Sequence, residues 1–250
     1  MKIAVITGAS SGMGREFAIQ IDKKYGKLDE IWIVARRKER LMELERQMRL
    51  PVRVISMDLT NMEDMKDFET MLKDLNPEIK LLVNCAGFGM IGRFDELDVW
   101  RQGEMIDTNC KALTLFTGLC LSYISNHSRI INVASSAGFA PQPYFNVYAA
   151  TKAYVLNYSR ALNAELRNRK ITVTAVCPGP VDTEFFHAAG KLMVSDSKKK
   201  LLSEPAKVVA QAIKDAALGN DISVYGAAMK SAHLASKILP DKLIMKIFKE

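Results

Sequence analysis

The sequence predicts one α/β domain built on a doubly wound, mostly parallel sheet with helices on both faces. Short apolar runs of about six residues alternate with helical segments along most of the chain. These runs are apolar throughout rather than at every second residue, which is typical of parallel strands covered on both faces. The length of 250 residues suits a single domain. The alternation therefore predicts right-handed β-α-β units that form one sheet.

Each expected strand is a run rich in Val, Ile and Leu, and each expected helix has apolar residues on one face, as Phe17 and Ile21 do. The expected strands are residues 2–7, 30–35, 52–57, 80–84, 129–134, 171–177 and 222–225. The expected helices are residues 12–25, 38–49, 62–74, 98–125, 147–168 and 205–218. The segment 98–125 is expected to be one long helix that bends or breaks around Gly118.

We treat residues 1–250 as a single domain with two distinctive segments. Residues 184–204 are rich in Lys, Ser and Met and have the weakest structural pattern. Their apolar residues Phe185, Phe186, Leu192 and Met193 could form a lid over a ligand cleft, so we expect a lid there. Residues 229–250 form an amphipathic helical tail that Pro240 interrupts. This tail could be a solvated closing helix, pack on a partner subunit, cover the substrate cleft or touch a membrane surface.

Charge and cysteine usage exclude several classes of protein. The net charge is +7, but residues 191–250 carry +5 of it, so a broadly basic nucleic-acid-binding body is not expected. The four cysteines form no CxxC pair, and the three histidines are dispersed, so we expect reduced thiols, a cytoplasmic protein and no metal site. The apolar run at residues 3–6 is too short for a signal peptide.

A glycine-rich loop joins the first expected strand to the first expected helix. Such glycines let the backbone approach a pyrophosphate closely, and the helix N-terminus offers it unpaired N–H groups. The candidate phosphate contacts are Gly8, Ser10, Ser11, Gly12, Met13 and Gly14. The spacing differs from GxGxxG, and by itself it could also mark a plain glycine-rich turn.

With Thr7, this loop resembles the Thr-Gly-x-x-x-Gly-x-Gly signature of the short-chain dehydrogenase/reductases. Further residues match that family's landmarks in order: Asp58 with Leu59, Asn84 with Ala86 and Gly87, Asn109, Ser135, Tyr148 with Lys152, and Pro178 with Gly179. The resemblance covers about residues 1–225 and implies a Rossmann-like fold and oxidoreductase activity. Cys85 stands where the family has a second Asn, which puts one hydrogen bond of that turn in doubt.

The candidate catalytic residues are suited to the reduction of a carbonyl. Tyr148 and Lys152 are four residues apart on one helix face, so the ammonium can lower the high pKa of the phenol. Ser135, which keeps the family's spacing to Gly138 and Tyr148, can bind the substrate oxygen. The resemblance implies that Asn109 completes a proton relay to Lys152. Taken singly, a Tyr-x-x-x-Lys pattern can arise by chance on a helix surface, and a serine after a strand can be a simple cap.

The end of the second strand predicts the nicotinamide cofactor. Enzymes that prefer NAD carry an acid there, whereas this chain has Arg36 and Arg37, which can bind a 2′-phosphate. We therefore expect NADP(H), with Arg36 as the main contact and Ser10 and Arg37 assisting. The family resemblance implies further cofactor contacts at Asp58, Leu59, Asn84, Ala86, Gly87, Tyr148, Lys152, Pro178, Gly179, Val181 and Thr183.

The substrate side is expected to be apolar. Candidate substrate contacts are Phe88, Phe94, Ser135, Tyr144, Tyr148 and Phe185, which favour a hydrophobic ketone or aldehyde of a steroid-like or acyl type. Two other functions stay open: a cofactor-binding regulator that senses redox state without turnover, and a relative of the sugar-nucleotide epimerases. The resemblance also implies a homodimer or homotetramer formed through the helices that hold Asn109 and Tyr148.

Overall fold

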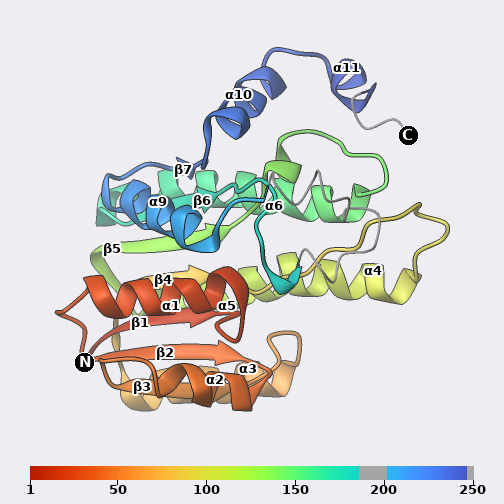
Figure 1. Ribbon diagram of the computed structural model, residues 1–250. Helices are drawn as coiled ribbons and strands as arrows, with labels where there is room; N and C mark the ends of the chain where they lie inside the picture. Colours follow the sequence, from red (N-terminus) through yellow and green to blue (C-terminus); the bar gives the residue numbers. More distant parts are fainter. Residues whose placement is uncertain (186–201, 247–250) are drawn as a thin grey trace.

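One seven-stranded parallel sheet forms the centre of the molecule, in the order β3-β2-β1-β4-β5-β6-β7 (Figure 1). The computed structural model describes residues 1–185 and 202–246. The strands are β1 (Lys2–Thr7), β2 (Glu30–Ala35), β3 (Val52–Ser56), β4 (Glu78–Asn84), β5 (Ile124–Val133), β6 (Thr172–Val176) and β7 (Ile222–Ser223). The predicted doubly wound sheet is confirmed, and its strand order reverses between β1 and β4.

Helices cover both faces of this sheet. Those described are α1 (Gly12–Lys24), α2 (Lys38–Glu45), α3 (Met62–Leu75), α4 (Val99–Ile106), α5 (Leu113–Leu121), α6 (Asn146–Glu165), α9 (Pro205–Ala217), α10 (Ala227–Ser236) and α11 (Asp241–Met245). Shorter helical segments are the π-helix η1 (Asp107–Ala112) and the 3-10 helices η2 (Ser136–Phe139) and η3 (Leu166–Arg169). The apolar residues of α1, α2 and α9 pack on one face, and those of α3, α5 and α6 pack on the other.

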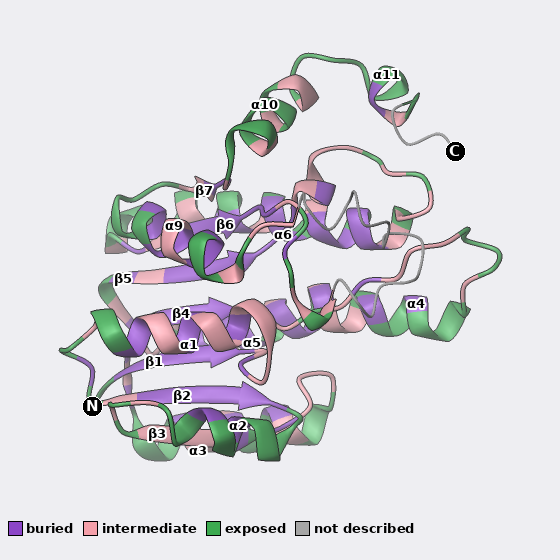
Figure 2. Ribbon diagram, viewed as in Figure 1, coloured by how far each residue is buried: buried purple, intermediate pink, exposed green. Residues whose placement is uncertain are grey.

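Side chains along β1 alternate between two buried clusters, which explains why the whole strand is apolar. Ala4 and Ile6 belong to the cluster under α1 and α2, whereas Ile3 and Val5 belong to the cluster under α3 and α5. Successive side chains of a strand point to opposite faces, so a strand covered on both sides needs apolar residues throughout. Figure 2 shows this burial along the central strands.

Two expectations about helix length are corrected. Segment 98–125 is not bent at Gly118: the irregular turn is η1, and the helix ends at Leu121. The strand then begins at Ile124, which is buried and pairs with Ile79, so sheet packing overrides the helical pattern there. Helix α2 ends at Glu45 rather than at residue 49, because the Asp22 carboxylate accepts the backbone N–H groups of Arg49 and Leu50 and draws the chain into a turn.

In the described part of the tail, α10 and α11 are separated at Pro240, which precedes α11 as its N-cap. Both helices lie at the top of Figure 1, on the side of α6 away from β2 and β3. The greater part of the expected lid, residues 186–201, lies outside the described residues. Among the described helices, none is long and apolar enough to cross a membrane.

Candidate active site

A cavity of about 1200 Å³ opens where the carboxyl ends of the strands meet. Its floor comes from the segments that follow β1, β4 and β5, which begin at Gly8, Cys85 and Ala134. In open α/β sheets, the crevice beside the point where the strand order reverses is the usual ligand site. The cavity occupies this position, between β1 and β4.

The glycine-rich loop brings backbone N–H groups to one end of the cavity. A Cβ on Gly14 would lie 2.2 Å from the carbonyl oxygen of Gly8, so only glycine allows α1 to start this close to β1. Ser11, the N-cap of α1, makes no capping hydrogen bond with its side chain. The first turn of α1 is thus left open toward the cavity, as an anion-binding helix terminus requires.

The turn after β4 tolerates Cys85 because a threonine holds its backbone. Thr7 Oγ1 accepts hydrogen bonds from the backbone N–H groups of Cys85 and Ala86, at 3.0 and 3.2 Å. Burial raises the pKa of the Cys85 thiol to about 12, so the side chain stays neutral. The position that departs from the family pattern therefore keeps its backbone geometry without the second amide.

Asn84 supports the cavity from below instead of lining it, and its expected cofactor contact stays a prediction. Its buried amide nitrogen donates to Thr117 Oγ1 at 2.9 Å and to Asn132 Oδ1 at 2.8 Å. The side chain points into the layer between β4, β5 and α5, because these partners lie on the neighbouring elements. Asn84 therefore ties the ends of two central strands to a helix.

The two arginines after β2 differ in their surroundings. The Arg36 side chain is 74% exposed, and its nearest ionic partner is Asp58, at 3.5 Å. Arg37 instead donates to the hydroxyls of Ser10 and Ser11 and to the Glu184 carboxylate at 2.9 Å. Both guanidiniums line the cavity, but Arg37 is held by the loop and Arg36 extends into solvent.

Glu184 had no signal in the sequence, yet it joins two segments that lie far apart along the chain. Its carboxylate pairs with Arg37 and with Arg40, and hydrogen bonds from both guanidiniums hold its pKa below the usual value. These pairs link the segment after β6 to the start of α2. Each side chain is about half exposed, so the individual pairs add little to stability.

Ser135 lies at the carboxyl end of β5 and begins the short helix η2. Its hydroxyl oxygen accepts the backbone N–H of Ala137 at 3.1 Å, and the residue is 9% exposed. Three residues later, Gly138 touches the backbone of α6: a Cβ there would lie 2.7 Å from the carbonyl carbon and oxygen of Lys152. This contact sets the spacing between Ser135 and the helix that carries Tyr148.

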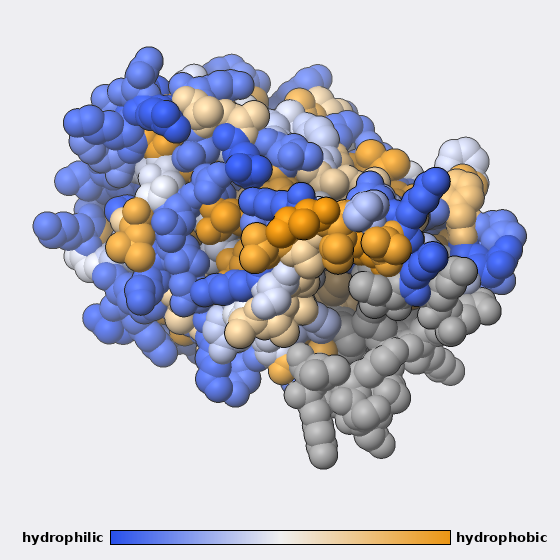
Figure 3. Space-filling view, turned by 90° about the horizontal axis from the view of Figure 1, so that it is seen from above, coloured by the Kyte–Doolittle hydropathy of each residue, from blue (hydrophilic) through white to orange (hydrophobic). Residues whose placement is uncertain are grey.

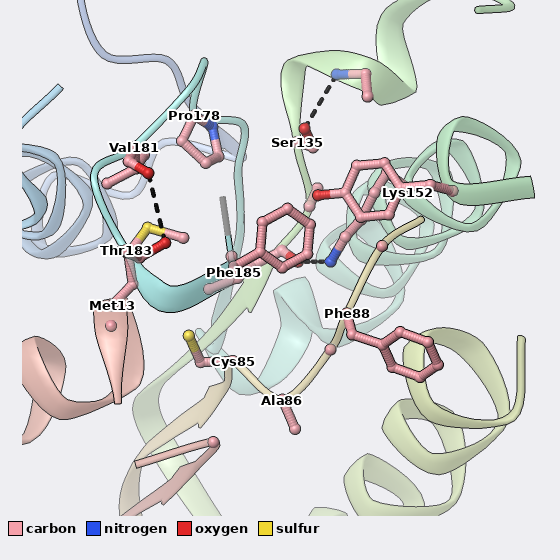
Figure 4. Close-up of a pocket in the computed structure, with 18 of the residues that line it drawn as sticks. Met13, Cys85, Ala86, Phe88, Ser135, Lys152, Pro178, Val181, Thr183 and Phe185 are labelled. Carbon is pink, nitrogen blue, oxygen red and sulfur yellow. Dashed lines mark hydrogen bonds between the residues drawn. The ribbon is translucent and has the colours of Figure 1, made fainter. Parts of the chain in front are cut away.

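Tyr148 and Lys152 lie one turn apart on α6, and both are buried. The Tyr148 ring stacks on Phe145 with ring centroids 4.2 Å apart, and Lys152 Nζ lies 5.6 Å from the centre of the Tyr148 ring. Figure 4 shows Lys152 and Ser135 approaching the same space, with Phe185 beside them. The structure thus brings the three expected catalytic side chains together at one cavity.

The electrostatics of this group differ from the simple expectation. Burial raises the pKa of Tyr148, and the hydrogen bond with Ser135 opposes that shift. Burial lowers the pKa of Lys152 to about 8, while its ammonium donates to the Val133 carbonyl at 2.8 Å instead of to the phenol. Burial thus disfavours the charged form of both groups, the ammonium of Lys152 and the phenolate of Tyr148.

Asn109 lies in η1, and its side chain is engaged by the protein. Its amide nitrogen donates to the Phe88 carbonyl and to Thr151 Oγ1, and its oxygen accepts the Phe88 backbone N–H at 3.0 Å. Asn109 does not line the cavity. The side chain therefore clamps the segment after β4 against α6, and the expected proton relay from Asn109 to Lys152 stays a prediction.

The rest of the cavity wall is mostly apolar. Phe88 and Phe185 line the cavity. The Arg101 guanidinium lies over the Phe88 ring, with its carbon 5.1 Å from the ring centroid. Phe94 and Tyr144 do not line the cavity, since Phe94 is 58% exposed on the outward loop before α4 and Tyr144 precedes α6 outside the lining. The remaining expected cofactor contacts that line the cavity are Met13, Asp58, Leu59, Ala86, Gly87, Pro178, Gly179, Val181 and Thr183.

The C-terminal helices close the far side of the cavity. Lining residues from this region are Met229, Ala232, Ala235, Ser236, Leu239 and Ile244. The sequence left several roles open for the tail, and the structure shows that the tail covers the cleft. Among the residues that the structure describes, no cluster of three His, Cys, Asp or Glu side chains could hold a metal ion.

Comparison with known proteins decides the family. The model of the short chain dehydrogenase family matches residues 2–192, which is more than half of the chain. The chain belongs to the short-chain dehydrogenase family. An uncharacterized oxidoreductase of Staphylococcus epidermidis is 34% identical over 184 residues, 73% of this chain and 79% of that protein.

Two solved short-chain dehydrogenase-like structures cover the whole chain. A short-chain dehydrogenase from Sphingobium yanoikuyae in complex with NADPH is 27% identical, with a TM-score of 0.79, and is covered over 97% of its length. An alcohol dehydrogenase from Comamonas testosteroni, specific for bulky-bulky ketones, is 26% identical with a TM-score of 0.76 and is covered over 96%. The chain is therefore an oxidoreductase of this family with a Rossmann-like sheet.

Proposed function

We propose that this oxidoreductase uses NADP(H) to interconvert a carbonyl and a secondary alcohol on a hydrophobic substrate. The observation that carries the proposal is the meeting of Ser135, Tyr148 and Lys152 at one cavity, beside an open helix N-terminus. A regulator without turnover would not need this set of proton-handling side chains. The apolar cavity wall supports the choice of substrate.

Each side chain has a distinct task in this reaction. A bound nicotinamide supplies or accepts the hydride. Tyr148 donates its phenolic proton to the developing alkoxide, and Ser135 donates a hydrogen bond that orients the same oxygen. Lys152 lies one helical turn from Tyr148, and burial lowers its pKa to about 8. Its ammonium would lie near the cofactor ribose and could return a proton to the phenolate of Tyr148.

The glycine-rich loop fits a dinucleotide phosphate. The missing side-chain cap at Ser11 and the close approach of Gly14 to Gly8 leave a backbone cradle that a side chain would fill. Arg36 supports the preference for NADP(H), because it is exposed at the cavity edge and can turn toward a 2′-phosphate. The ion pair between Arg36 and Asp58 is exposed, so breaking it would cost little free energy.

The direct test is NADPH oxidation with a broad panel of carbonyl compounds that includes steroids and acyl ketones. We expect turnover on bulky apolar ketones or aldehydes and little on small charged ones. Tight NADPH binding without turnover on any member of the panel would favour the redox-sensing regulator. Activity restricted to small charged ketones would contradict the assignment of a hydrophobic substrate.

Substitution of Arg36 by Ala tests the choice of cofactor. Loss of a charge-assisted hydrogen bond to the 2′-phosphate should weaken NADPH binding by roughly 1.5–3 kcal/mol and leave NADH binding nearly unchanged. Arg93→Ala is the matched control, since this guanidinium lies outside the cavity lining. An equal loss of affinity for NADPH and NADH would contradict the role of Arg36.

We also propose a homodimer or homotetramer in the cytoplasm. Helices α4 and α6 expose Val99, Ile106 and Tyr154, which supports association through the helices near the active site. The four cysteines are free, in keeping with a reducing compartment. Sedimentation velocity of the purified protein tests the oligomer, and a monomer across the micromolar range would contradict it.

A further inference from the structure

Helix α10 presents two different faces, and its inner face belongs to the cavity. Met229, Ala232 and Ser236 recur at helical spacing and line the cavity. His233 packs on Phe139 of η2 with ring centroids 4.6 Å apart, and Met229 lies against Gly179. These contacts fix how the helix is rotated about its axis, so the opposite face must look outward.

The outer face of α10 and the segment through α11 is apolar and exposed. Leu234 is 61% exposed, Ile238 71% and Leu243 49%. Neither Leu234 nor Ile238 lines the cavity. Figure 3, which views this side of the molecule, shows apolar residues gathered in a band at the position of these helices. We call Leu234, Ile238 and Leu243 the outer face.

Lysines surround the outer face, and acids are nearly absent. Exposed lysines of this segment are Lys230, Lys237, Lys242 and Lys246. Between residues 227 and 246 the single acidic residue is Asp241. An apolar stripe flanked by lysines on short helices is the chemistry that binds the interface of a bilayer containing anionic lipid.

The same charges argue against a second copy of this chain as the occupant. A two-fold contact places the same patch on both subunits, so it would bring these lysines against one another. The repulsion would not be compensated, because Asp241 is the only carboxylate available in the segment. Anionic phospholipid headgroups, in contrast, pair with the lysines while the acyl boundary receives the leucine and isoleucine side chains.

We propose that α10 and α11 dock the protein on a membrane surface that contains anionic phospholipid. The protein lies on the surface and does not span it. Because the inner face of the same helices lines the cavity, docking places one cavity wall within about one helix diameter of the lipid. This arrangement suits an apolar carbonyl compound that partitions into the bilayer, a consequence that rests on the proposed function.

Co-sedimentation of the full-length protein with vesicles tests the docking. We expect binding to phosphatidylcholine vesicles that contain phosphatidylglycerol, weak binding to phosphatidylcholine alone, and release at high salt. Leu234→Glu combined with Ile238→Glu should reduce the bound fraction about tenfold, because it places charge on the outer face that would enter the lipid. Leu218→Glu is the matched control, an exposed leucine at the end of α9, and should bind as the wild type does.

Three outcomes would overturn the proposal. The first is no binding of the wild type to anionic vesicles, and the second is equal sedimentation of the double variant and the wild type. The third is a shift of the double variant from dimer to monomer in lipid-free solution with vesicle binding intact, which would assign the outer face to a second copy.

NADPH oxidation with a water-soluble ketone separates this test from the proposed function. The double variant should retain that activity, since its residues lie outside the cavity, and a native-like thermal unfolding curve should show that it folds. A wild type that binds vesicles but reduces no carbonyl compound would contradict the proposed function and leave the docking supported.

Discussion

The two walls of the cavity are built in different ways. On the wall of α6, Tyr148, Thr151 and Lys152 are buried, and the turn at Gly138 packs directly on the helix backbone. On the opposite wall, α10 has no buried residue, and in α11 only Ile244 is buried. One wall is part of the protein core, and the other rests on it.

This difference supports a division of the proposed function, with the chemistry on one wall and the recognition of the substrate on the other. The α6 wall is fixed by hydrogen bonds to Val133 and Asn109 and by the close contact of Gly138 with its backbone, which suits the precise placement that the proposed proton transfer needs. The α10–α11 wall is held mainly by the contacts of Met229 and His233. This looser packing suits the role that we propose for this wall, selection of the substrate.

The largest effect is expected from Tyr148→Phe on the buried wall. Removal of the phenolic proton donor should lower turnover by about 10²–10⁴-fold while the affinity for NADPH is kept. Steady-state NADPH oxidation and fluorescence titration measure the two quantities. Tyr154→Phe is the control, because this tyrosine lies on the same helix but is exposed, and the variant should keep near wild-type turnover. Comparable activity in the two variants would remove Tyr148 from the mechanism.

Two glycine substitutions should have opposite effects on stability. Gly138→Ala places a Cβ 2.7 Å from the Lys152 carbonyl, so we expect a loss of about 1–3 kcal/mol in the free energy of unfolding and reduced turnover. Gly118→Ala, in α5, meets no atom within 4 Å and should raise the free energy by up to about 1 kcal/mol. Urea denaturation measures both. Equal changes would show that the contact of the turn with α6 is unimportant.

The depressed pKa of Lys152 predicts a dependence of stability on pH. Its pKa is about 8 in the folded chain and 10.5 in the unfolded chain. Between these values the unfolded chain binds more protons, so this lysine makes the free energy of unfolding rise with pH, by on the order of 1–3 kcal/mol. Lys152→Met should not show this rise in the free energy of unfolding. Denaturation of both proteins at pH 7 and about pH 10 measures the difference.

The comparison with wild type isolates this lysine. Both proteins contain the buried thiols, whose raised pKa makes the free energy of unfolding fall as the pH rises above about 9. This contribution is common to the two proteins, so it cancels in the comparison. Lys111→Met, which removes an exposed lysine, is the matched control and should follow the wild-type pH dependence. A Lys152→Met curve parallel to wild type would mean that the ammonium is not desolvated.

The smallest effect is expected on the C-terminal wall. Leu239 lines the cavity but is 42% exposed, so Leu239→Ala should raise the KM for a bulky apolar ketone only a few-fold, or about 1 kcal/mol. The kcat for a small ketone should not change, because the catalytic residues lie on the other wall. A loss of kcat as large as that of Tyr148→Phe would show that the two walls act as one unit.

Most of the fold could be predicted because local sequence and global packing agree. The strand at Lys2–Thr7 and that at Glu30–Ala35 were expected with the observed bounds, since apolar runs of that length have few alternatives in a sheet covered on both faces. The error at Ile124 arose where a locally helical pattern lost to pairing with Ile79. Such a competition is decided by contacts between distant segments.

By itself, the sequence determined the sheet, the glycine-rich loop, and the presence of Ser135, Tyr148 and Lys152 in register on a strand end and a helix. These features depend on spacing along one strand or one helical turn, which can be read directly from the sequence. Tertiary structure alone decided that Arg37 is held by Ser10 and Glu184 while Arg36 extends into solvent. It likewise decided that Asn109 clamps Phe88 and that the tail closes the cleft. Each of these outcomes is a contact between segments far apart in sequence, where burial and hydrogen-bond partners are set only once the chain has folded.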